Sequence, residues 1–159
     1  PPERPSTVLA ALGPKMLRLS GERACGAHPY FVPVDHTAQA REILGAGPIL
    51  APERMVVLDT DPTRAKEIAR KAMAVYLRAP NYVNNLKRFG FTDDDVAGGG
   101  SDRLVDSIVA CGPVDAALER VRRHFHAGAS HVCVQVLGDD PTAVPLSGWK
   151  ELAAAMAEA

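Results

Sequence analysis

This sequence has almost no net charge and no long hydrophobic run. Its formal net charge at pH 7 is −1, which gives no electrostatic case for nucleic acid or an anionic membrane as the main partner. The longest apolar runs cover residues 8–12, 55–58 and 132–137, whereas a helix that crosses a bilayer needs about 20 apolar residues. We therefore predict neither a nucleic-acid partner nor a membrane partner.

Cysteine is scarce and scattered. Cys25, Cys111 and Cys133 are the only cysteines. An odd number without the spacing of a disulfide framework is typical of free thiols in a reducing compartment. The sequence also does not open with a cationic leader followed by an apolar signal core. Both features predict a cytoplasmic location.

Patterns for metal or nucleotide binding are incomplete. Cys25 and His28 have a C-x-x-H spacing, but no second pair completes a zinc set. Gly98-Gly99-Gly100-Ser101 lacks the lysine and the strand-to-helix context of a P-loop, so we interpret it as a flexible connection or a lid hinge. Residues 93–95 lack the ligand spacing of a calcium loop and are typical of a helix start. We predict no metal site.

Short apolar runs rich in β-branched residues alternate with amphipathic segments. Four strands are predicted, at Val8–Leu12, Ala27–Val32, Arg54–Thr60 and His131–Leu137. The first is expected to be buried on both faces, and Pro48–Glu53 is interpreted as a loop. Their alternation with helices predicts an α/β fold of about four parallel strands with flanking helices. This order fits either an open sheet or part of a barrel. The length suits one domain spanning residues 1–159.

The helix signals are mostly local. Asp35 and Asp61 are the expected N-caps of two helices, and Pro62 suits the first turn of the second. Several short helices are expected within residues 80–112, which we interpret as a helical insertion before the last strand. An alanine-rich helix is predicted from Trp149 to Ala159.

The turn after the first predicted strand is the leading binding-site candidate. It consists of Ala10, Ala11, Leu12, Gly13 and Pro14. Small side chains let backbone N–H groups approach an anion, and the following helix directs the positive end of its dipole there. We interpret the turn as a phosphate or carboxylate site. The alternative is a glycine–proline turn that binds nothing.

Histidines supply further candidates. His28 and Tyr30 alternate onto one face near the carboxyl end of the second predicted strand, where they could bind a substrate. The alternative is a satisfied pair in the core. His36 is expected at the surface, and His124 and His126 are expected on a solvated helical face.

Several segments, in order and spacing, carry a family resemblance. The sequence resembles the bacterial-luciferase-like monooxygenases, and it is most similar to the branch that uses the deazaflavin coenzyme F420. The residues that carry this resemblance are Val8–Leu17 (VLAALGPKML), Leu50–Leu58 (LAPERMVVL), Asn81–Phe91 (NYVNNLKRFGF), Ser101–Asp106 (SDRLVD) and Gly128–Val136 (GASHVCVQV).

The resemblance implies a (β/α)8 TIM barrel of which this chain would be the C-terminal half. It implies coenzyme F420, or FMN as the alternative, with the phosphate region of the cofactor at Ala10–Pro14, and a small-molecule substrate. In that family the amino-terminal half contributes most residues around the reactive ring, so the catalytic residues stay unassigned. The family commonly has an acid where this chain has Cys25, which implies different hydrogen bonding around Cys25 in this chain.

Two functions follow. The first is an oxidoreductase or monooxygenase that uses F420 or reduced flavin, in which this chain supplies part of the cofactor phosphate site. The second is a catalytically incomplete half-barrel that acts as a binding or self-associating domain. Unpaired sheet edges and an apolar inner face favour a homo-oligomer or pairing with a second half-barrel. An unrelated phosphate-binding α/β domain is a weaker alternative.

Overall fold

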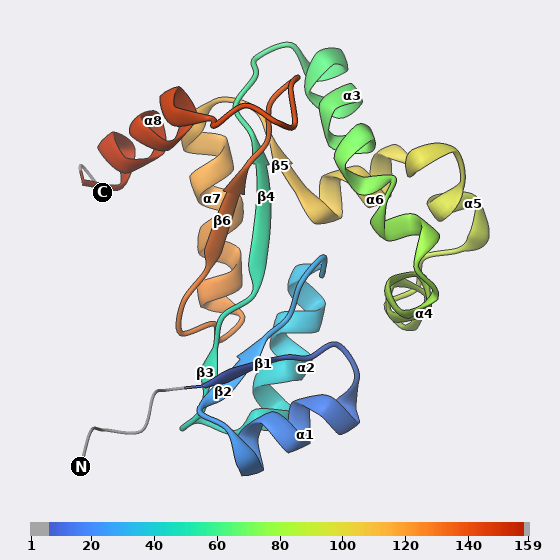
Figure 1. The fold of residues 1–159 in the computed structure, drawn as a ribbon, viewed down its shortest axis with the longest axis vertical. Helices are drawn as coiled ribbons and strands as arrows, with labels where there is room; N and C mark the ends of the chain where they lie inside the picture. Colours follow the sequence, from blue (N-terminus) through green and yellow to red (C-terminus); the bar gives the residue numbers. More distant parts are fainter. Residues whose placement is uncertain (1–6, 158–159) are drawn as a thin grey trace.

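The computed structural model describes residues 7–157, in which short parallel strands form two sheets surrounded by helices (Figure 1). All four strand pairings are parallel, so the predicted α/β fold with flanking helices is confirmed. The first sheet has the order β1-β2-β3, and the second has the order β5-β4-β6. The strands are β1 (Val8–Ala10), β2 (Gly26–His28), β3 (Ile49–Leu50), β4 (Glu53–Val57), β5 (Val109–Cys111) and β6 (Cys133–Val136).

Eight α-helices and two 3-10 helices fill the connections within residues 7–157. The α-helices are α1 (Pro14–Arg23), α2 (Val34–Leu44), α3 (Pro62–Met73), α4 (Pro80–Arg88), α5 (Asp93–Val96), α6 (Asp102–Ile108), α7 (Val114–His126) and α8 (Leu146–Ala157); the 3-10 helices are η1 (Tyr76–Arg78) and η2 (Ala97–Gly99). The predicted insertion at 80–112 thus holds α4, α5, η2 and α6, and it ends in β5.

One extended segment, residues 49–57, joins the two sheets. The N–H of Ala51 donates to the carbonyl of Ala27 in β2 (2.9 Å), and the carbonyl of Val57 accepts from the N–H of Gly112 after β5 (3.1 Å). Because backbone groups of alternate residues point to the same edge, β2 and β5 follow one another along one edge of the segment. The other edge of β4 pairs with β6.

Helices pack on both faces of this segment. Met55 and Val57 share a buried cluster with residues of α3 and α6. Val56, between them, belongs to a second cluster with α7 and α8. Ala27 and Leu50 pack in a third cluster with α1 and α2. The alternation of side chains along each strand therefore decides which helices cover which face.

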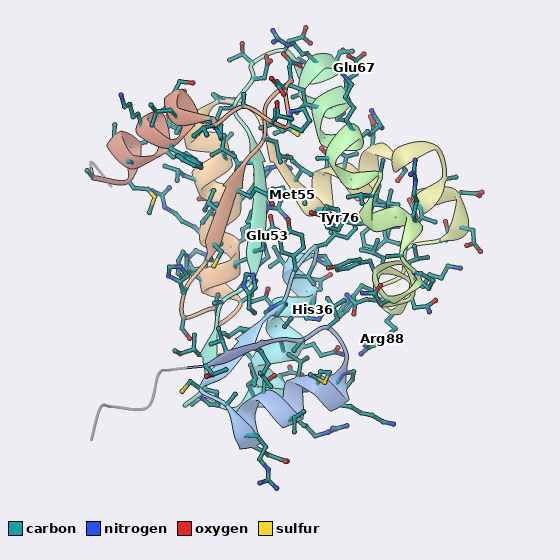
Figure 2. The ribbon with its side chains drawn as sticks, viewed as in Figure 1. His36, Glu53, Met55, Glu67, Tyr76 and Arg88 are labelled. Atoms are coloured by element: carbon teal, nitrogen blue, oxygen red, sulfur yellow. The ribbon has the colours of Figure 1, made fainter. Side chains whose placement is uncertain are left out.

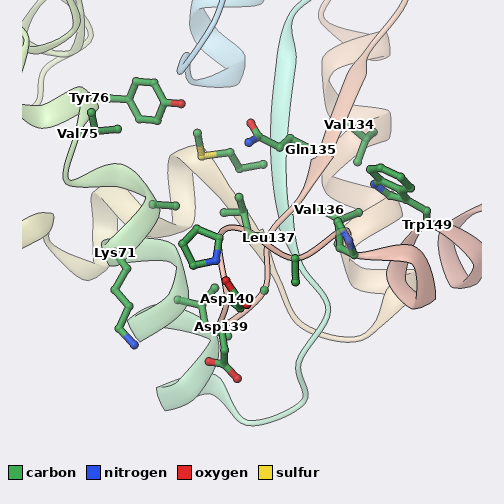
Figure 3. Close-up of a pocket in the computed structure, with 17 residues that line it drawn as sticks. Lys71, Val75, Tyr76, Val134, Gln135, Val136, Leu137, Asp139, Asp140 and Trp149 are labelled. Atoms are coloured by element: carbon green, nitrogen blue, oxygen red, sulfur yellow. The ribbon is translucent and has the colours of Figure 1, made fainter.

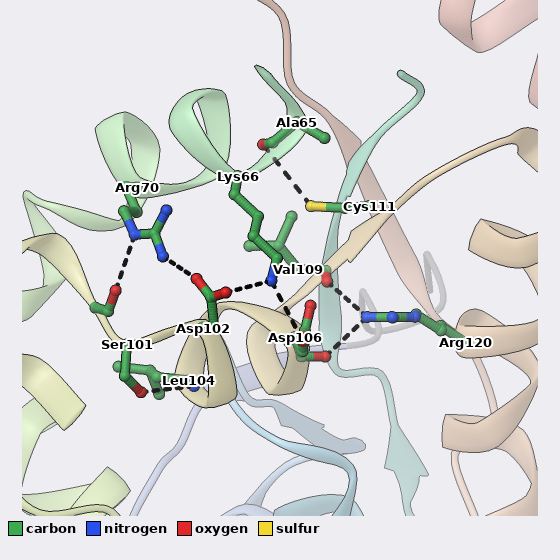
Figure 4. Close-up of polar contacts among 11 residues, drawn as sticks. Ala65, Lys66, Arg70, Ser101, Asp102, Leu104, Asp106, Val109, Cys111 and Arg120 are labelled. Atoms are coloured by element: carbon green, nitrogen blue, oxygen red, sulfur yellow. Dashed lines mark hydrogen bonds and ion pairs between the residues drawn. The ribbon is translucent and has the colours of Figure 1, made fainter. Parts of the chain in front are cut away.

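A polar junction attaches α6 to α3 (Figure 4). Lys66 donates to one carboxylate oxygen of Asp102 (2.7 Å), and Arg70 forms an ion pair with the other. The Nε of Arg70 also donates to the carbonyl of Gly100 (2.9 Å). The hydroxyl oxygen of Ser101 caps the first turn of α6. These contacts hold the end of the triple-glycine segment against α3.

Several sequence predictions about local structure were wrong. Val8 and Ala10 are exposed, although the first strand was expected to be buried on both faces. The second strand ends at His28, and Phe31 takes φ 57°, which is outside the β region. Strands β3 and β5 lie where a loop and a helix were expected. Asp61 does cap α3, but Pro33, and not Asp35, is the N-cap of α2.

Candidate functional site

The β1–α1 turn, Ala10–Pro14, lies at the carboxyl end of β1. Gly13 is the N-cap of α1 and has no side chain to cap it, so the first-turn N–H groups of Lys15 and Met16 face no acceptor within the helix. The carbonyl of Leu12 accepts a hydrogen bond from Nε2 of His36 (2.8 Å), which fixes the middle of the turn to α2. The turn therefore combines a fixed backbone with free N–H donors.

Arg88, at the end of α4, places a guanidinium group beside this turn (Figure 2). A Cβ atom built on Gly13 would lie 4.0 Å from Nη1 of Arg88. Nη2 of Arg88 donates to the side-chain oxygen of Gln39 on α2 (3.2 Å). Arg88 was not predicted as a site residue, because its position 75 residues after Gly13 gives no local signal. Its charge makes the turn more favourable for an anion.

His28 is the nearest neighbour of this turn on β2. Ala10 pairs with His28 in the parallel register, so the end of β1 lies beside the imidazole. Nδ1 of His28 lies 2.6 Å from the carbonyl oxygen of Ala51. A carbonyl oxygen only accepts, so Nδ1 carries a proton, and in the tautomer with this single ring proton Nε2 is an acceptor.

Tyr30 joins two other side chains in what we call the tyrosine–glutamine cluster (Tyr30, Tyr76 and Gln135). The hydroxyl of Tyr30 donates to the side-chain oxygen of Gln135 (2.5 Å), so the hydroxyl of Tyr76, 3.0 Å away, donates to Tyr30. The rings of His28 and Tyr30 lie 6.3 Å apart at 70°. Burial, followed by the hydrogen bond with Tyr76, raises the pKa of Tyr30 far above its ordinary value, so the phenol stays protonated.

Glu53 is a buried acid at the start of β4. Only 4% of its surface is exposed. Oε2 accepts a hydrogen bond from the N–H of Phe31 (3.3 Å), whereas Oε1 has no partner among the described residues. Burial raises the pKa of Glu53 from 4.5 to about 7, against the lowering effects of the Phe31 N–H and Arg54. Sequence reasoning missed Glu53, because the segment Pro48–Glu53 was interpreted as a loop.

A cavity of about 570 Å³ opens beside the tyrosine–glutamine cluster (Figure 3). Figure 3 shows Tyr76 and Gln135 on one side of the cavity, and Lys71, Asp139 and Asp140 on another. Its remaining wall is mainly apolar and comes from α3, β4, β6 and the segment that leads into α8. The residues of the Ala10–Pro14 turn do not line it, and neither do His28 or Tyr30 themselves. The cavity could hold an apolar molecule with a polar end at the cluster.

The predicted exposure of two other histidines was wrong. His36 and His124 are both fully buried. Nδ1 of His124 lies 2.8 Å from the hydroxyl of Thr37, which connects α7 to α2. Burial lowers the pKa of His36 and lowers that of His124 to about 3. Both rings are therefore neutral parts of the core. His124 was expected on a solvated face because charged residues surround it in the sequence, and His36 was expected at the surface because it lies near a helix start.

Comparison with known proteins gives no match at the level of sequence: no protein-family model and no curated protein matches this chain. Solved structures do match in fold. An F420-dependent secondary alcohol dehydrogenase in complex with an F420-acetone adduct has a TM-score of 0.62 and 14% identity, over 88% of this chain and 46% of that one. The coenzyme F420 dependent tetrahydromethanopterin reductase from Methanopyrus kandleri has a TM-score of 0.64 and 19% identity, over 80% and 43%.

An FMN complex matches as well. The oxygenating constituent of 3,6-diketocamphane monooxygenase from Pseudomonas putida has a TM-score of 0.54 and 20% identity, over 86% of this chain and 42% of that one. At these identities the likeness shows the fold alone. The chain spans less than half the length of these three structures. Within residues 7–157, no helix has both the length and the apolar character that crossing a membrane requires.

Proposed function

We propose that this chain is the C-terminal half of a luciferase-like (β/α)8 barrel, and that it holds the phosphate region of coenzyme F420, or of FMN, in an oxidoreductase or monooxygenase. The fold likeness to F420 and FMN proteins over less than half of their length supports this assignment. The substrate would be a small molecule. The cofactor supplies hydride or oxygen chemistry when it is bound.

The observation that carries the proposal is the convergence of Arg88 on the β1–α1 turn. Phosphate binding at a helix N-terminus needs free N–H donors and close backbone approach. The N–H groups of Lys15 and Met16 are the donors, Gly13 without a side chain allows the close approach, and the guanidinium of Arg88 adds a charged donor that can contact two phosphate oxygens. In this arrangement Ala10, Ala11, Leu12 and Pro14 shape the backbone around the phosphate.

The adjacent strand ends offer groups for a substrate. Nε2 of His28 is free to accept a hydrogen bond, and the tyrosine–glutamine cluster presents polar atoms to the 570 Å³ cavity. We propose that His28 and Tyr30 position a substrate, with Tyr30 acting through Tyr76 and Gln135. Glu53, with its pKa near 7, could hold or release a proton in the same region.

A cofactor titration tests this function. F420 and FMN are titrated separately into the 159-residue chain, and binding is followed by cofactor fluorescence. We expect binding of at least one cofactor, and we expect Arg88→Gln to weaken it about tenfold because a charged hydrogen bond is lost. Arg78→Gln is the matched control, since Arg78 is an exposed arginine on the neighbouring η1.

Two results would contradict the proposal. One is that neither cofactor binds at concentrations up to about 1 mM, which corresponds to a negligible affinity for a dedicated site. The other is that the Arg88 and Arg78 variants bind the cofactor equally well.

A second candidate function is self-association, and a row of exposed apolar side chains favours it. Val8 and Ile49 lie on either side of Gly26, which is buried and has no side chain, across the first sheet. Val8 is 41% exposed and Ile49 is 39% exposed, on the sheet face opposite the one that Leu50 packs against α1 and α2. A second copy, or a second half-barrel, could cover this row.

A further inference from the structure

A separate, polar cavity lies on the opposite face of β4 from Glu53. Its volume is about 320 Å³. Three arginines line it: Arg54 from β4, and Arg120 and Arg123 from α7. The cavity also includes the start of α2, and two carboxylates, Asp35 and Asp106, lie at its wall. The proposed cofactor turn and the 570 Å³ cavity share no lining residue with it.

Arg54 is the most unusual residue of this cavity. It is only 2% exposed, and Nη1 donates to the carbonyl of Ser107 (2.5 Å). Its Nε has no hydrogen-bond partner, and its guanidinium forms no ion pair with another described residue. A buried charge without a counter-ion is costly. Burial and the nearby charge of Arg120 lower the pKa of Arg54 to about 10, so its surroundings disfavour the cation.

The geometry of the guanidinium group indicates what would satisfy it. With Nη1 directed to Ser107, the Nε–H and one N–H of Nη2 form the remaining edge of the fork. This edge matches two oxygens of a phosphate or carboxylate. The unpaired Nε–H is therefore a buried donor that an oxyanion would satisfy.

Two neighbouring arginines, Arg120 and Arg123, add positive charge to the cavity. Arg120 uses Nη1 on the carbonyls of Asp106 and Val109 (2.9 and 3.2 Å), as Figure 4 shows, which fixes its guanidinium at the cavity wall. Arg123 is exposed and forms no ion pair within residues 7–157. Of the two carboxylates, Asp106 already contacts Lys66 (3.8 Å). The balance of charge at the cavity is therefore positive.

The start of α2 contributes backbone donors. The N-cap Pro33 forms no side-chain cap, so the N–H groups of Val34 and Asp35 lack acceptors within the helix. The positive end of the α2 dipole adds to the three arginines. Several N–H donors around a space of this size suit a tetrahedral dianion better than a planar carboxylate, because a phosphate group accepts hydrogen bonds in more directions.

We propose that Arg54, Arg120 and Arg123 form, with the first turn of α2, a binding site for a phosphate group, supplied either as free phosphate or as a small phosphate monoester. The bound dianion would neutralise Arg54 and join β4 to α2 and α7. The site would therefore couple ligand binding to the stability of the fold. This inference does not rest on the proposed cofactor function.

The test compares two neighbouring arginines on α7. Inorganic phosphate and glycerol 3-phosphate are titrated into the 159-residue chain, with sodium chloride at equal ionic strength as the reference, and binding is measured by calorimetry and by the shift of the melting temperature. We expect saturable binding that raises the melting temperature. Arg123→Gln should weaken it about tenfold, whereas Arg122→Gln, at an exposed arginine that does not line the cavity, should change it less than about twofold.

Comparing the two ligands identifies the source of the phosphate group, and further variants locate the site. Tighter binding of glycerol 3-phosphate than of phosphate assigns the site to a monoester, and equal or weaker binding assigns it to free phosphate. Arg54→Met should remain folded and lose phosphate binding. The proposal is overturned if phosphate stabilises the chain no more than chloride does, or if the Arg123 and Arg122 variants bind phosphate equally. Loss of the phosphate effect in Arg88→Gln would place the ligand at the β1–α1 turn and would overturn it too.

Discussion

At the scale of single residues, Glu53 has the environment that most favours a change of protonation near neutral pH. The carboxyl group is buried, one of its oxygens has no hydrogen-bond partner among the described residues, and its pKa is raised to about 7. The folded state therefore retains a proton on Glu53 at pH values where the unfolded chain, with an ordinary pKa of 4.5, has lost it. Stability from this group is fully present below about pH 4.5 and is lost as the pH rises to 7.

Replacing Glu53 with glutamine tests this linkage. Because the neutral amide imitates the protonated acid, Glu53→Gln should unfold like the wild type at pH 4.5 and should be more stable at pH 8 by up to about 3 kcal/mol. Chemical denaturation at both pH values measures the difference. Glu67→Gln, at an exposed acid on α3 (Figure 2), is the control. The same pH dependence in both variants would contradict the assignment of the shift to Glu53.

At the scale of helices and strands, local chemistry explains some boundaries and tertiary pairing explains others. Asp61 starts α3 because its carboxylate accepts from the N–H groups of Thr63 and Arg64, a contact that the sequence predicts from three adjacent residues. Strands β3 and β5 have two and three residues. Such short segments become strands only because the edges of their neighbours offer hydrogen bonds, so no local pattern predicted them.

The cap at Asp61 gives a prediction at this scale. Asp61→Ala removes the acceptor for Thr63 N–H (2.9 Å) and should lower the free energy of unfolding by about 1 kcal/mol. Asp61→Asn keeps a side-chain oxygen in the same place and should cost much less. Urea denaturation of the two variants beside the wild type makes the comparison. Equal losses for alanine and asparagine would mean that charge, and not the hydrogen bond, stabilises the start of α3.

At the scale of the whole molecule, the exposed row at Val8 and Ile49 leaves part of the first sheet without a covering layer. If a second copy covers it, light scattering after size-exclusion chromatography should give a mass above the 16.9 kDa of one chain. Ile49→Lys should restore the monomer, because a charge would be buried in the interface. Leu19→Lys, at a leucine on α1 that is 41% exposed, should not. A wild-type chain that stays monomeric at about 0.1 mM would contradict the self-association proposal at protein concentrations up to that value.

The sequence by itself determined the elements that depend on neighbours a few residues apart. These are the parallel α/β pattern, the cap at Asp61 and the glycine–proline turn at the end of β1. Each depends on hydrogen bonds or side-chain periodicity within one helix turn or one strand.

Only the tertiary structure decided which distant groups meet. It placed Arg88 beside Gly13, joined Tyr30 to Gln135, buried His36 and His124, and left the Nε of Arg54 without a partner among residues 7–157. These contacts join residues up to 105 positions apart. Their partners are selected by the packing of helices against alternate faces of β4, which no short stretch of sequence encodes.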